Sequence, residues 1–345
     1  MTETVSADYW TSHYFDAEFN RQEWQAHPET IQRQFVLQGG CMREEWFFKK
    51  YCGGQAVERA ASIGAGRAET ELQMLINGKV GHMDLYDISA AGIEYAKAQA
   101  EAVGLGDRIH CHVVAPGVPV IPEGRYDLIM FVASLHHMPD ITATLKSAYR
   151  GLKEGGHIFC VNEYIGPDRF SYPKEHLRIV REFHKNLPAK FRKHGRPELV
   201  LPTARDVAVA DPSEAEFSSQ ILPTMRKLFP SLEVTSLYGS FAFMLFWGLE
   251  HDALYETEAG RELVAFILNM DQSLVEAGIL PDYFAHLVAR KPTPGQSRAL
   301  ERSIDLEGTV RRALTRFKRS ARDITSDTAN RALGKLKRLG RRIIR

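Results

Sequence analysis

Val57-Glu-Arg-Ala-Ala-Ser-Ile63 runs directly into Gly64-Ala-Gly66-Arg-Ala68, and a helical pattern then continues to Ile76. The first segment is apolar enough to be a buried strand, and glycines at its carboxyl end let the backbone turn sharply. A strand, glycine turn and helix of this kind bring a ligand against main-chain N–H groups at the start of the helix. Taken alone, the glycine pattern is a weak signal, because ordinary structural turns also carry it.

A carboxylate at the end of the second predicted strand strengthens this signal. Asp87 follows His82–Tyr86 and lies 23 residues after Gly64. An acidic side chain at that place can accept hydrogen bonds from the two hydroxyls of a ribose. Together the two features indicate a ligand with an adenosine-type ribose. The alternative is a tight turn followed by an aspartate that only caps a helix.

The surrounding sequence alternates short apolar strands with helical patterns, which is typical of βαβ units and a parallel sheet. We therefore predict an α/β fold with a Rossmann-like, doubly wound sheet. The predicted strands are Val57–Ile63, His82–Tyr86, Ile109–Val114, Tyr126–Val132, His157–Val161, Leu232–Leu237 and Tyr283–Ala289. Ser213-Glu-Ala-Glu216 matches a capping box and predicts a helix that runs towards Leu228.

Four segments resemble class I S-adenosylmethionine-dependent methyltransferases of the small-molecule branch, in order and in spacing. They are Ser62–Glu69, Asp87-Ile88, Tyr126–His137, which ends in Ser-Leu-His-His, and Leu152–Gly156. The resemblance covers about 55–165 and extends to 226–292. A nucleotide-dependent oxidoreductase is the enzyme alternative, but it predicts a third glycine near Ala68.

The resemblance implies S-adenosylmethionine as the cofactor and a set of residues around it. Ile63, Gly64, Ala65 and Gly66 would line its methionine end, Asp87 would hold the ribose hydroxyls, Ile88 would pack on the adenine, and Phe131, Val132, Ala133 and Ser134 would lie beneath the sulfonium. The chain departs from the family at Ser62, where an acidic residue is common. It also departs at Ala115-Pro116, where a polar residue commonly binds the adenine.

Three side chains are candidates for catalysis. Methyl transfer to a hydroxyl is speeded when a general base removes the proton, by about 10²–10⁴-fold. His136 and His137 follow the fourth strand, at the edge where open α/β sheets bind ligands, and Glu163 follows the fifth. The alternative is that the histidines pack on the cofactor or cap a helix, and that Glu163 pairs with an arginine. No metal site is predicted, because the four cysteines are scattered without metal-ligand spacing.

The sequence divides into three parts. Residues 1–54 are predicted to be a helical segment whose aromatic residues pack on the sheet or cover the site, and 55–292 are the predicted methyltransferase domain, with an insertion at about 166–225. The insertion is basic over 174–196, and its histidines, His184 among them, are interpreted as part of a solvated helical face. Residues 293–345 are predicted to be a basic amphipathic helical tail.

Charge separates the tail from the rest of the chain. It holds 15 Lys and Arg against 5 Asp and Glu, although the whole chain has a net charge of only +1. A basic amphipathic helix can lie on an anionic membrane or dock on a protein. Nucleic-acid binding is not expected, because no groove of aromatic and basic residues is seen. The absence of a signal peptide and of a long apolar run predicts a cytoplasmic protein, with peripheral contact at the inner face of a membrane as one role for the tail.

The function predicted from the sequence is transfer of a methyl group from S-adenosylmethionine to a small molecule. The acceptor atom is expected to be an oxygen of a sugar, glycolipid or secondary metabolite. The non-enzyme alternative is a catalytically inactive methyltransferase-like scaffold that binds partners.

Overall fold

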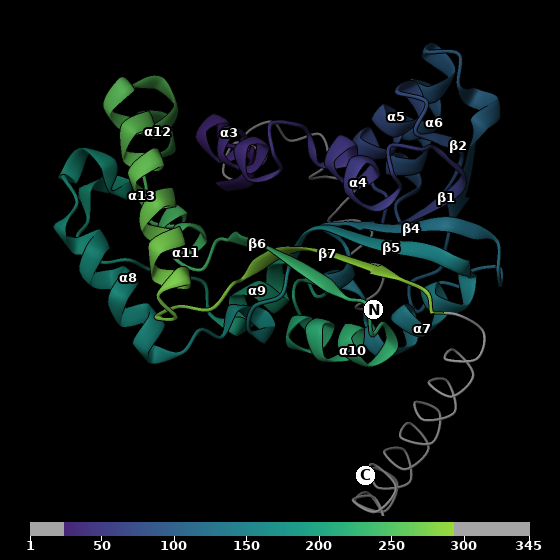
Figure 1. Cartoon of the computed structure of the whole chain (residues 1–345). Coiled ribbons are helices and arrows are strands. Elements are labelled where there is room, and N and C mark those ends of the chain that lie inside the picture. The colour runs from purple at the N-terminus through teal and green to yellow at the C-terminus, as the bar shows by residue number, and fades with distance from the viewer. Residues whose placement is uncertain (1–23, 293–345) are drawn as a thin grey trace, which may run out of the picture.

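The structure, a computed structural model, describes residues 24–292, whose strands form one mixed seven-stranded sheet (Figure 1). Across the sheet the strands lie in the order β3-β2-β1-β4-β5-β7-β6. The first five are parallel, and β7 is antiparallel to both β5 and β6. The strands are β1 (Val57–Ile63), β2 (Val80–Asp87), β3 (Ile109–Val113), β4 (Tyr126–Val132), β5 (Leu152–Tyr164), β6 (Glu233–Tyr238) and β7 (Phe284–Arg290).

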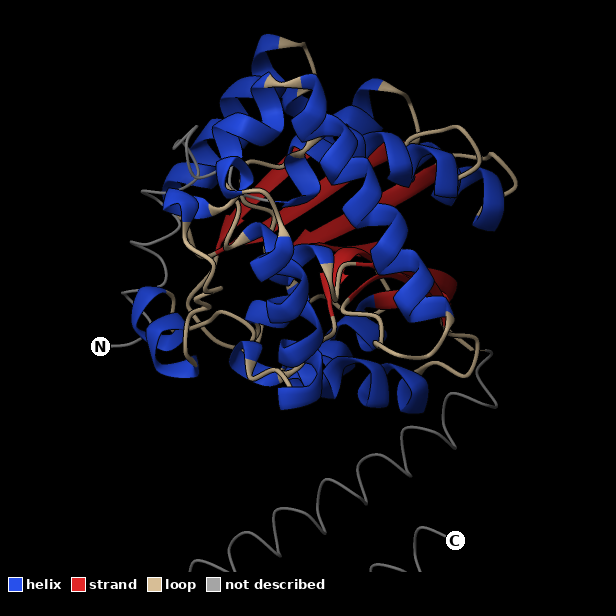
Figure 2. Ribbon diagram, turned by 90° about the vertical axis from the view of Figure 1, so that its left-hand side faces the viewer, coloured by secondary structure: helices blue, strands red, loops and turns tan. Residues whose placement is uncertain are grey.

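Helices cover both faces of this sheet, as Figure 2 shows. α4, α5 and α6 pack on one face and α7 and α10 on the other. The helices are α3 (Pro28–Leu37), α4 (Arg43–Tyr51), α5 (Glu69–Ile76), α6 (Ala90–Ala102), α7 (Ile141–Gly151), α8 (Lys174–Asn186), α9 (Ala204–Ala210), α10 (Ile221–Leu228), α11 (Ala242–Phe246), α12 (His251–Glu256) and α13 (Glu258–Glu276). The predicted α/β fold with a Rossmann-like sheet is confirmed.

Burial on both faces explains why the central strands are almost wholly apolar. In β4, Leu128 and Met130 join the core under α4, α5 and α6, whereas Ile129 and Phe131 join the core under α7 and α10. Successive side chains of a strand point to opposite faces, so a strand covered on both sides must be apolar throughout. The adjacency of β1 and β4 also fixes the point where the strand order reverses, and ligands bind at such points in open α/β sheets.

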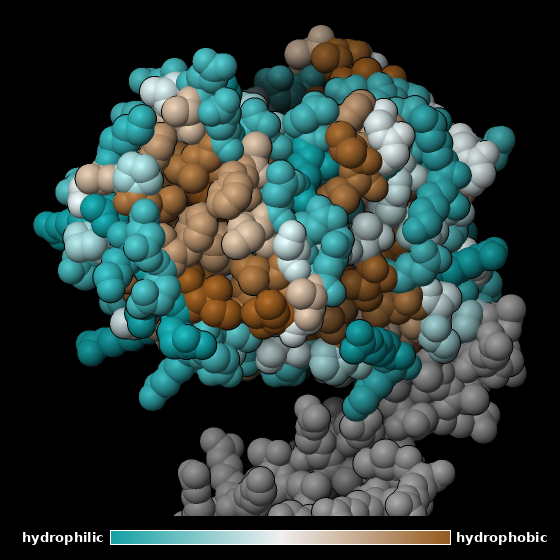
Figure 3. Space-filling view, turned by 60° about the vertical axis from the view of Figure 1, so that its left-hand side comes forward, coloured by the Kyte–Doolittle hydropathy of each residue, from teal (hydrophilic) through white to brown (hydrophobic). Residues whose placement is uncertain are grey.

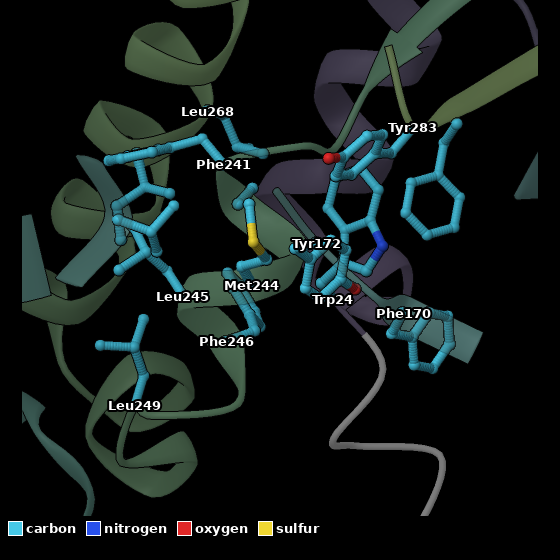
Figure 4. Close-up of a cluster of buried hydrophobic side chains, with 14 of the residues drawn as sticks. Trp24, Phe170, Tyr172, Phe241, Met244, Leu245, Phe246, Leu249, Leu268 and Tyr283 are labelled. Carbon is cyan, nitrogen blue, oxygen red and sulfur yellow. The ribbon is translucent and has the colours of Figure 1, made fainter. Parts of the chain in front are cut away.

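A third apolar cluster lies beside the sheet and joins the segment after β5 to α11 and α13. Trp24, Tyr172, Phe241 and Leu268 are among its buried members, and Figure 4 shows how the side chains around Met244 pack. α8, α11, α12 and α13 gather there, at the left of Figure 1. The segment between β5 and β6 therefore has its own core and is not a loose loop.

Two expectations for that segment are wrong. Ser213 does not start a helix: its hydroxyl donates to Asp211 Oδ1 at 2.7 Å, and α10 begins only at Ile221. The capping box of this segment forms earlier, between Thr203 and Asp206. His184 is not solvated either. It is buried, and carbonyl oxygens lie next to both ring nitrogens: that of Gly248 is 2.9 Å from Nε2, and a second lies near Nδ1.

One face of the described part carries a broad apolar area. Figure 3 shows hydrophobic side chains gathered on the face turned forward, with hydrophilic side chains around them. Exposed large hydrophobic residues of the described chain include Trp247 and Phe266. A contiguous apolar patch of this kind is a candidate contact surface. Between residues 24 and 292, none of the helices is both long and apolar enough to span a bilayer.

Some sequence-based expectations lie outside the described residues. They concern the aromatic residues of 1–23 and the whole basic tail, 293–345. The later aromatic residues of the N-terminal part are described. Trp24 is buried, and Phe47 of α4 stacks on Phe159 of β5 with ring centroids 4.6 Å apart. These two side chains are part of the core.

Candidate functional site

The glycine turn after β1 is held by Asp87. The carboxylate accepts a hydrogen bond from the backbone nitrogen of Gly66 at 2.7 Å through Oδ2 and from that of Ser89 at 2.7 Å through Oδ1. Asp87 is almost fully buried, and burial raises the pKa of its carboxyl group above the ordinary value, against the opposing effect of these backbone hydrogen bonds. Each carboxylate oxygen has two lone-pair sites. The carboxylate can therefore accept from a ribose hydroxyl in addition to these backbone nitrogens.

Gly64 approaches the end of β4 so closely that no side chain fits. Its φ is +68°, and a Cβ atom built there would lie 2.7 Å from Cβ of Ser134. The Ser134 hydroxyl donates to the carbonyl oxygen of Ile63 at 2.6 Å, so the two strand ends are joined directly. A glycine at this point lets the ends of β1 and β4 approach each other closely. The residues present therefore fit a cofactor that needs close approach to the main chain.

Ser62, where an acidic residue was expected, recruits a carboxyl group from elsewhere. Its hydroxyl donates to Oε1 of Glu71, which comes from α5. Burial raises the pKa of Glu71 to about 7, although Ser62 and Arg43 act in the opposite direction. The acid that is missing from the strand is thus supplied by the next helix.

The remaining cofactor candidates occupy different environments. Ala65 is buried against α5, and Ile88 is half-buried just after β2. Phe131 is fully buried in the core under α7, so its side chain supports the strand end from below. Val132 is half-buried, and Ala133 is exposed with a left-handed φ of +47°. Ala133 makes the bend that turns the chain from β4 towards the histidines.

His136 and Glu163, predicted separately, lie in direct contact. The short 3-10 helix Leu135–His137 follows β4, and Glu163 lies near the end of β5 with no exposed surface. Glu163 Oε1 accepts from the backbone nitrogen of His136 at 2.7 Å and lies 2.6 Å from its Nδ1. Its other oxygen accepts from the backbone nitrogen of Leu135 at 3.2 Å. One carboxylate therefore fixes both the 3-10 helix and the imidazole of His136.

His137 is held by the loop before α10. Its Nδ1 lies 3.1 Å from the hydroxyl of Ser213 and 3.6 Å from Oδ2 of Asp211. The two imidazole rings are adjacent, with centroids 4.2 Å apart. Glu214 completes the group, because its two carboxylate oxygens each lie 3.7 Å from one Nε2, that of His136 and that of His137.

The surroundings of the two histidines shift their pKa values in opposite directions. Burial alone would lower the pKa of His136, but the charges of Glu163, Glu214 and Asp211 outweigh burial and raise this pKa to about 9. Burial lowers the pKa of His137 well below its usual range, and the nearby His136 adds to the effect.

The sequence missed three members of this group, Asp211, Ser213 and Glu214. They lie about 50 residues beyond β5, within Asp211-Pro-Ser-Glu214, and no spacing rule links them to His136. The only local signal was the capping-box pattern at Ser213, which predicted a helix start. Ser213 does not cap a helix; its hydroxyl contacts His137, which lies in the 3-10 helix after β4.

The comparison with protein families identifies the domain. Residues 49–193 match a family model described as a methyltransferase domain. The match spans the glycine turn, Asp87, the histidine pair and Glu163. The chain contains a class I S-adenosylmethionine-dependent methyltransferase domain. S-adenosylmethionine is the cofactor of this domain, and the seven-stranded sheet with antiparallel β7 is its fold.

Curated relatives of the methyltransferase domain act on different acceptors. The 27-O-demethylrifamycin SV methyltransferase of Amycolatopsis mediterranei is 28% identical over 160 residues, which is 45% of this chain and 58% of that protein. The tRNA 5-carboxymethoxyuridine methyltransferase of Escherichia coli is 33% identical over 99 residues, 28% of this chain and 37% of that protein. The chain spans about half the length, or less, of the curated relatives it matches.

Solved structures with a similar backbone come from several methyltransferases. The geranyl diphosphate C-methyltransferase of Streptomyces coelicolor A3(2) is 13% identical, with a TM-score of 0.47 over 84% of this chain and 97% of that chain. The phosphoethanolamine N-methyltransferase 2 of Haemonchus contortus is 14% identical, with a TM-score of 0.47 over 82% of this chain and 60% of that chain.

Proposed function

We propose that this chain transfers the methyl group of S-adenosylmethionine to an oxygen of a small-molecule acceptor, such as a sugar, glycolipid or secondary metabolite. The observation that carries the proposal is that the glycine turn and the polar cluster around His136 lie next to each other. Ser134, which contacts the glycine turn, is separated by one residue from His136, which Glu163 holds in place. A methyl donor at the glycine turn would therefore lie beside a polar cluster suited to an acceptor hydroxyl.

The proposed roles of the residues follow from their contacts. S-adenosylmethionine, when bound, supplies an electrophilic methyl group on a sulfonium. Gly64 and Gly66 would let it approach the main chain, and Asp87 would hold its ribose. His136, His137 and Glu163 would orient the acceptor hydroxyl and assist removal of its proton. A fixed near-attack geometry can account for several kcal/mol of the barrier.

Aromatic side chains next to the histidines favour an acceptor with an apolar part. The ring of Tyr164 lies 6.2 Å from that of His136, edge to face, and 5.0 Å from that of Phe170. Phe170 in turn lies 6.2 Å from Tyr172. These three side chains are almost fully buried in the apolar cluster beside the sheet, so the cluster borders the histidine pair. Sites with apolar and aromatic surroundings hold ligands that are largely apolar, with a few polar groups to orient them. The relative that acts on a rifamycin supports the same acceptor class.

The basic helix α8 gives no support to a phosphate-bearing acceptor. Lys174, Arg178, Arg181 and Lys185 are exposed on its outer side, whereas Val180 is buried. A charged face of this kind is solvated in most helices. Among the acceptor classes named above, a secondary metabolite therefore agrees best with the residues around His136.

Incubation with a methyl-labelled donor tests the proposal. The full-length chain would be mixed with S-adenosylmethionine that carries a ¹³C methyl group and with small-molecule extracts. We expect new masses that contain the label, and their loss when Asp87 is replaced. Cofactor binding without any labelled product, across extracts rich in hydroxylated metabolites, would contradict the proposed reaction. Absence of cofactor binding as well would favour the scaffold alternative.

We also propose, from its sequence, that the tail 293–345 brings the enzyme to an anionic membrane surface. Its 15 basic residues against 5 acidic ones support attraction to anionic lipid. Vesicles of phosphatidylglycerol and phosphatidylcholine should sediment the full chain but not a chain that ends at Lys291. Equal sedimentation of the two would exclude this role and favour protein docking.

A further inference from the structure

We propose that His136, His137 and Glu214 form a binding site for one divalent transition-metal ion. One ligand atom from each of these residues lies within 4.8 Å of the others. His136 is buried and the other two are half-buried, so the group differs from the exposed acidic clusters common on protein surfaces. The sequence predicted no metal site because its cysteines lack metal-ligand spacing, and Glu214 lies far from the histidines along the chain.

The contacts of His136 direct one ring nitrogen towards Glu214. Glu163 Oε1 lies 2.6 Å from Nδ1 and also accepts from the backbone nitrogen of His136. A carboxylate oxygen only accepts, so Nδ1 carries a proton. Nε2 is then the atom available to a metal, and it lies 3.7 Å from Glu214 Oε1.

The contacts of His137 have the same consequence. The hydroxyl of Ser213 donates to Asp211 Oδ1 at 2.7 Å, so towards His137 Nδ1, at 3.1 Å, it acts as an acceptor. Nδ1 of His137 therefore carries the proton and Nε2 the lone pair. That lone pair lies 3.7 Å from Glu214 Oε2. Here a nitrogen and an oxygen that both accept are close together, which a cation between them would stabilise.

The distances suit a small transition-metal ion. Metal–ligand bonds of about 2.0–2.1 Å at tetrahedral angles place ligand atoms about 3.3–3.4 Å apart. The two distances of 3.7 Å run to different oxygens of Glu214 and are a few tenths of an ångström wider. One ligand atom from each residue lies within 4.8 Å of the others, so the three side chains would have to draw together when an ion binds. Two imidazoles with one carboxylate are a ligand set of zinc and of other first-row metals, and they are poorly suited to magnesium.

The surroundings also match those of a metal centre. Metal-binding histidines usually donate their other N–H to a carboxylate, carbonyl or similar acceptor, and here Glu163 and Ser213 take that part. Arg169 fixes the loop that presents Glu214, because its guanidinium donates to the backbone carbonyls of Asp211 at 3.2 Å and Glu214 at 3.1 Å. The ligands are therefore held in place by groups outside the site.

The role of the ion rests on the proposed methyl transfer, but its binding does not. An acceptor hydroxyl that coordinates the ion would have a lowered pKa and would release its proton to water. The resulting oxygen is the nucleophile that the proposed reaction requires. The metal site would therefore be the means by which the polar cluster assists proton removal.

Zinc binding to the full-length chain, without an affinity tag, tests this inference. The chain would first be freed of metal by a chelator and then titrated with ZnCl₂ against a chromophoric zinc indicator. We expect one site per chain, at least about tenfold weaker in Glu214→Gln and His137→Gln. Glu163→Gln should weaken binding about 10–100-fold, as for other outer partners of metal-bound histidines. Zinc should also raise the melting temperature of the wild-type chain and not that of Glu214→Gln.

His110→Gln is the matched control, because it removes an exposed histidine far along the sheet, on β3, and should leave the zinc affinity unchanged. Failure of the wild-type chain to bind one equivalent of zinc would overturn the inference. So would equal binding and equal thermal shifts in the wild type and Glu214→Gln. Binding of S-adenosylmethionine to the metal-free chain should be normal, because no ligand belongs to the glycine turn. Loss of cofactor binding would instead contradict the proposed function.

Discussion

Oδ2 of Asp87 accepts a hydrogen bond from the backbone nitrogen of Gly66 at 2.7 Å. The residue that we expect to bind the ribose therefore also shapes the turn that holds the rest of the cofactor. Because its second oxygen binds the backbone of Ser89, Asp87 joins the ends of β1 and β2 to the start of α6. Cofactor affinity and local stability should depend on this side chain together.

Replacing Asp87 with asparagine should lower both the cofactor affinity and the stability of the chain. An amide offers one accepting oxygen in place of two, so one buried backbone N–H loses its partner, at a cost of about 1–3 kcal/mol. We expect S-adenosylmethionine to bind at least about tenfold more weakly by calorimetry, and the melting temperature to fall. Asp127→Asn is the matched control, since Asp127 also accepts from a backbone nitrogen, that of Arg59, but belongs to the opposite end of the strands. It should lower stability and leave cofactor affinity unchanged; equal losses of affinity would contradict the assignment.

Gly64→Ala should push the ends of β1 and β4 apart and distort the glycine turn. Its Cβ would lie 2.7 Å from that of Ser134, and overpacking of this kind typically costs about 1–3 kcal/mol. Gly78→Ala has a comparable φ of +64° but meets nothing within 4 Å, so it isolates the cost of the left-handed backbone. Calorimetry should show a strong loss of cofactor affinity in the first variant only. Similar affinities in both would mean that the cofactor does not bind at the glycine turn.

Glu163→Gln should separate chemistry from cofactor binding. The change removes a carboxylate that holds two backbone nitrogens and the imidazole of His136. We expect labelled-methyl transfer to fall by about 10²-fold or more while cofactor affinity stays within a fewfold. Glu233→Gln, an exposed acid on β6, serves as the control. Full transfer activity in Glu163→Gln would remove Glu163 from the proposed mechanism.

Glu71→Gln should change how stability depends on pH. Burial raises the pKa of Glu71 to about 7 in the folded chain, against an ordinary value of 4.5. Between these values the folded chain keeps a proton that the unfolded chain releases, so the wild type loses stability as pH rises through this window. Glutamine remains neutral, and the melting temperature of the variant relative to wild type should therefore rise by several degrees from pH 5 to pH 8. Glu69→Gln, at an exposed position of the same helix, is the control. A difference in melting temperature between Glu71→Gln and wild type that does not change with pH, or that changes equally in Glu69→Gln, would contradict this assignment.

The sequence was sufficient to predict the sheet because the signals of the sheet are local. Strands covered on both faces are apolar along their whole length, as in β4. The turn after β1 requires positive φ angles, and the glycines that allow them stand at those positions in the sequence. The contact of His136 with Glu163 could also be anticipated, because both lie at the carboxyl ends of neighbouring parallel strands, β4 and β5. Parallel strands end at the same edge of a sheet.

The rest of the polar cluster had no such signal. Glu214 reaches the histidines because Arg169 binds the carbonyls of its loop, and a contact to main-chain oxygens leaves no trace in residue spacing. Ser213 was misread because a serine three residues before a glutamate has the same pattern whether it caps a helix or holds a histidine. The acid that Ser62 needed was likewise supplied from another element, by Glu71 of α5.

A crystal structure of the full chain with S-adenosylhomocysteine would measure the central relationship directly. We expect both ribose hydroxyls within hydrogen-bonding distance of the Asp87 carboxylate, and the sulfur at the glycine turn, on the side of Ser134. S-adenosylhomocysteine bound elsewhere, or with a ribose that has no contact with Asp87, would contradict the proposed cofactor site.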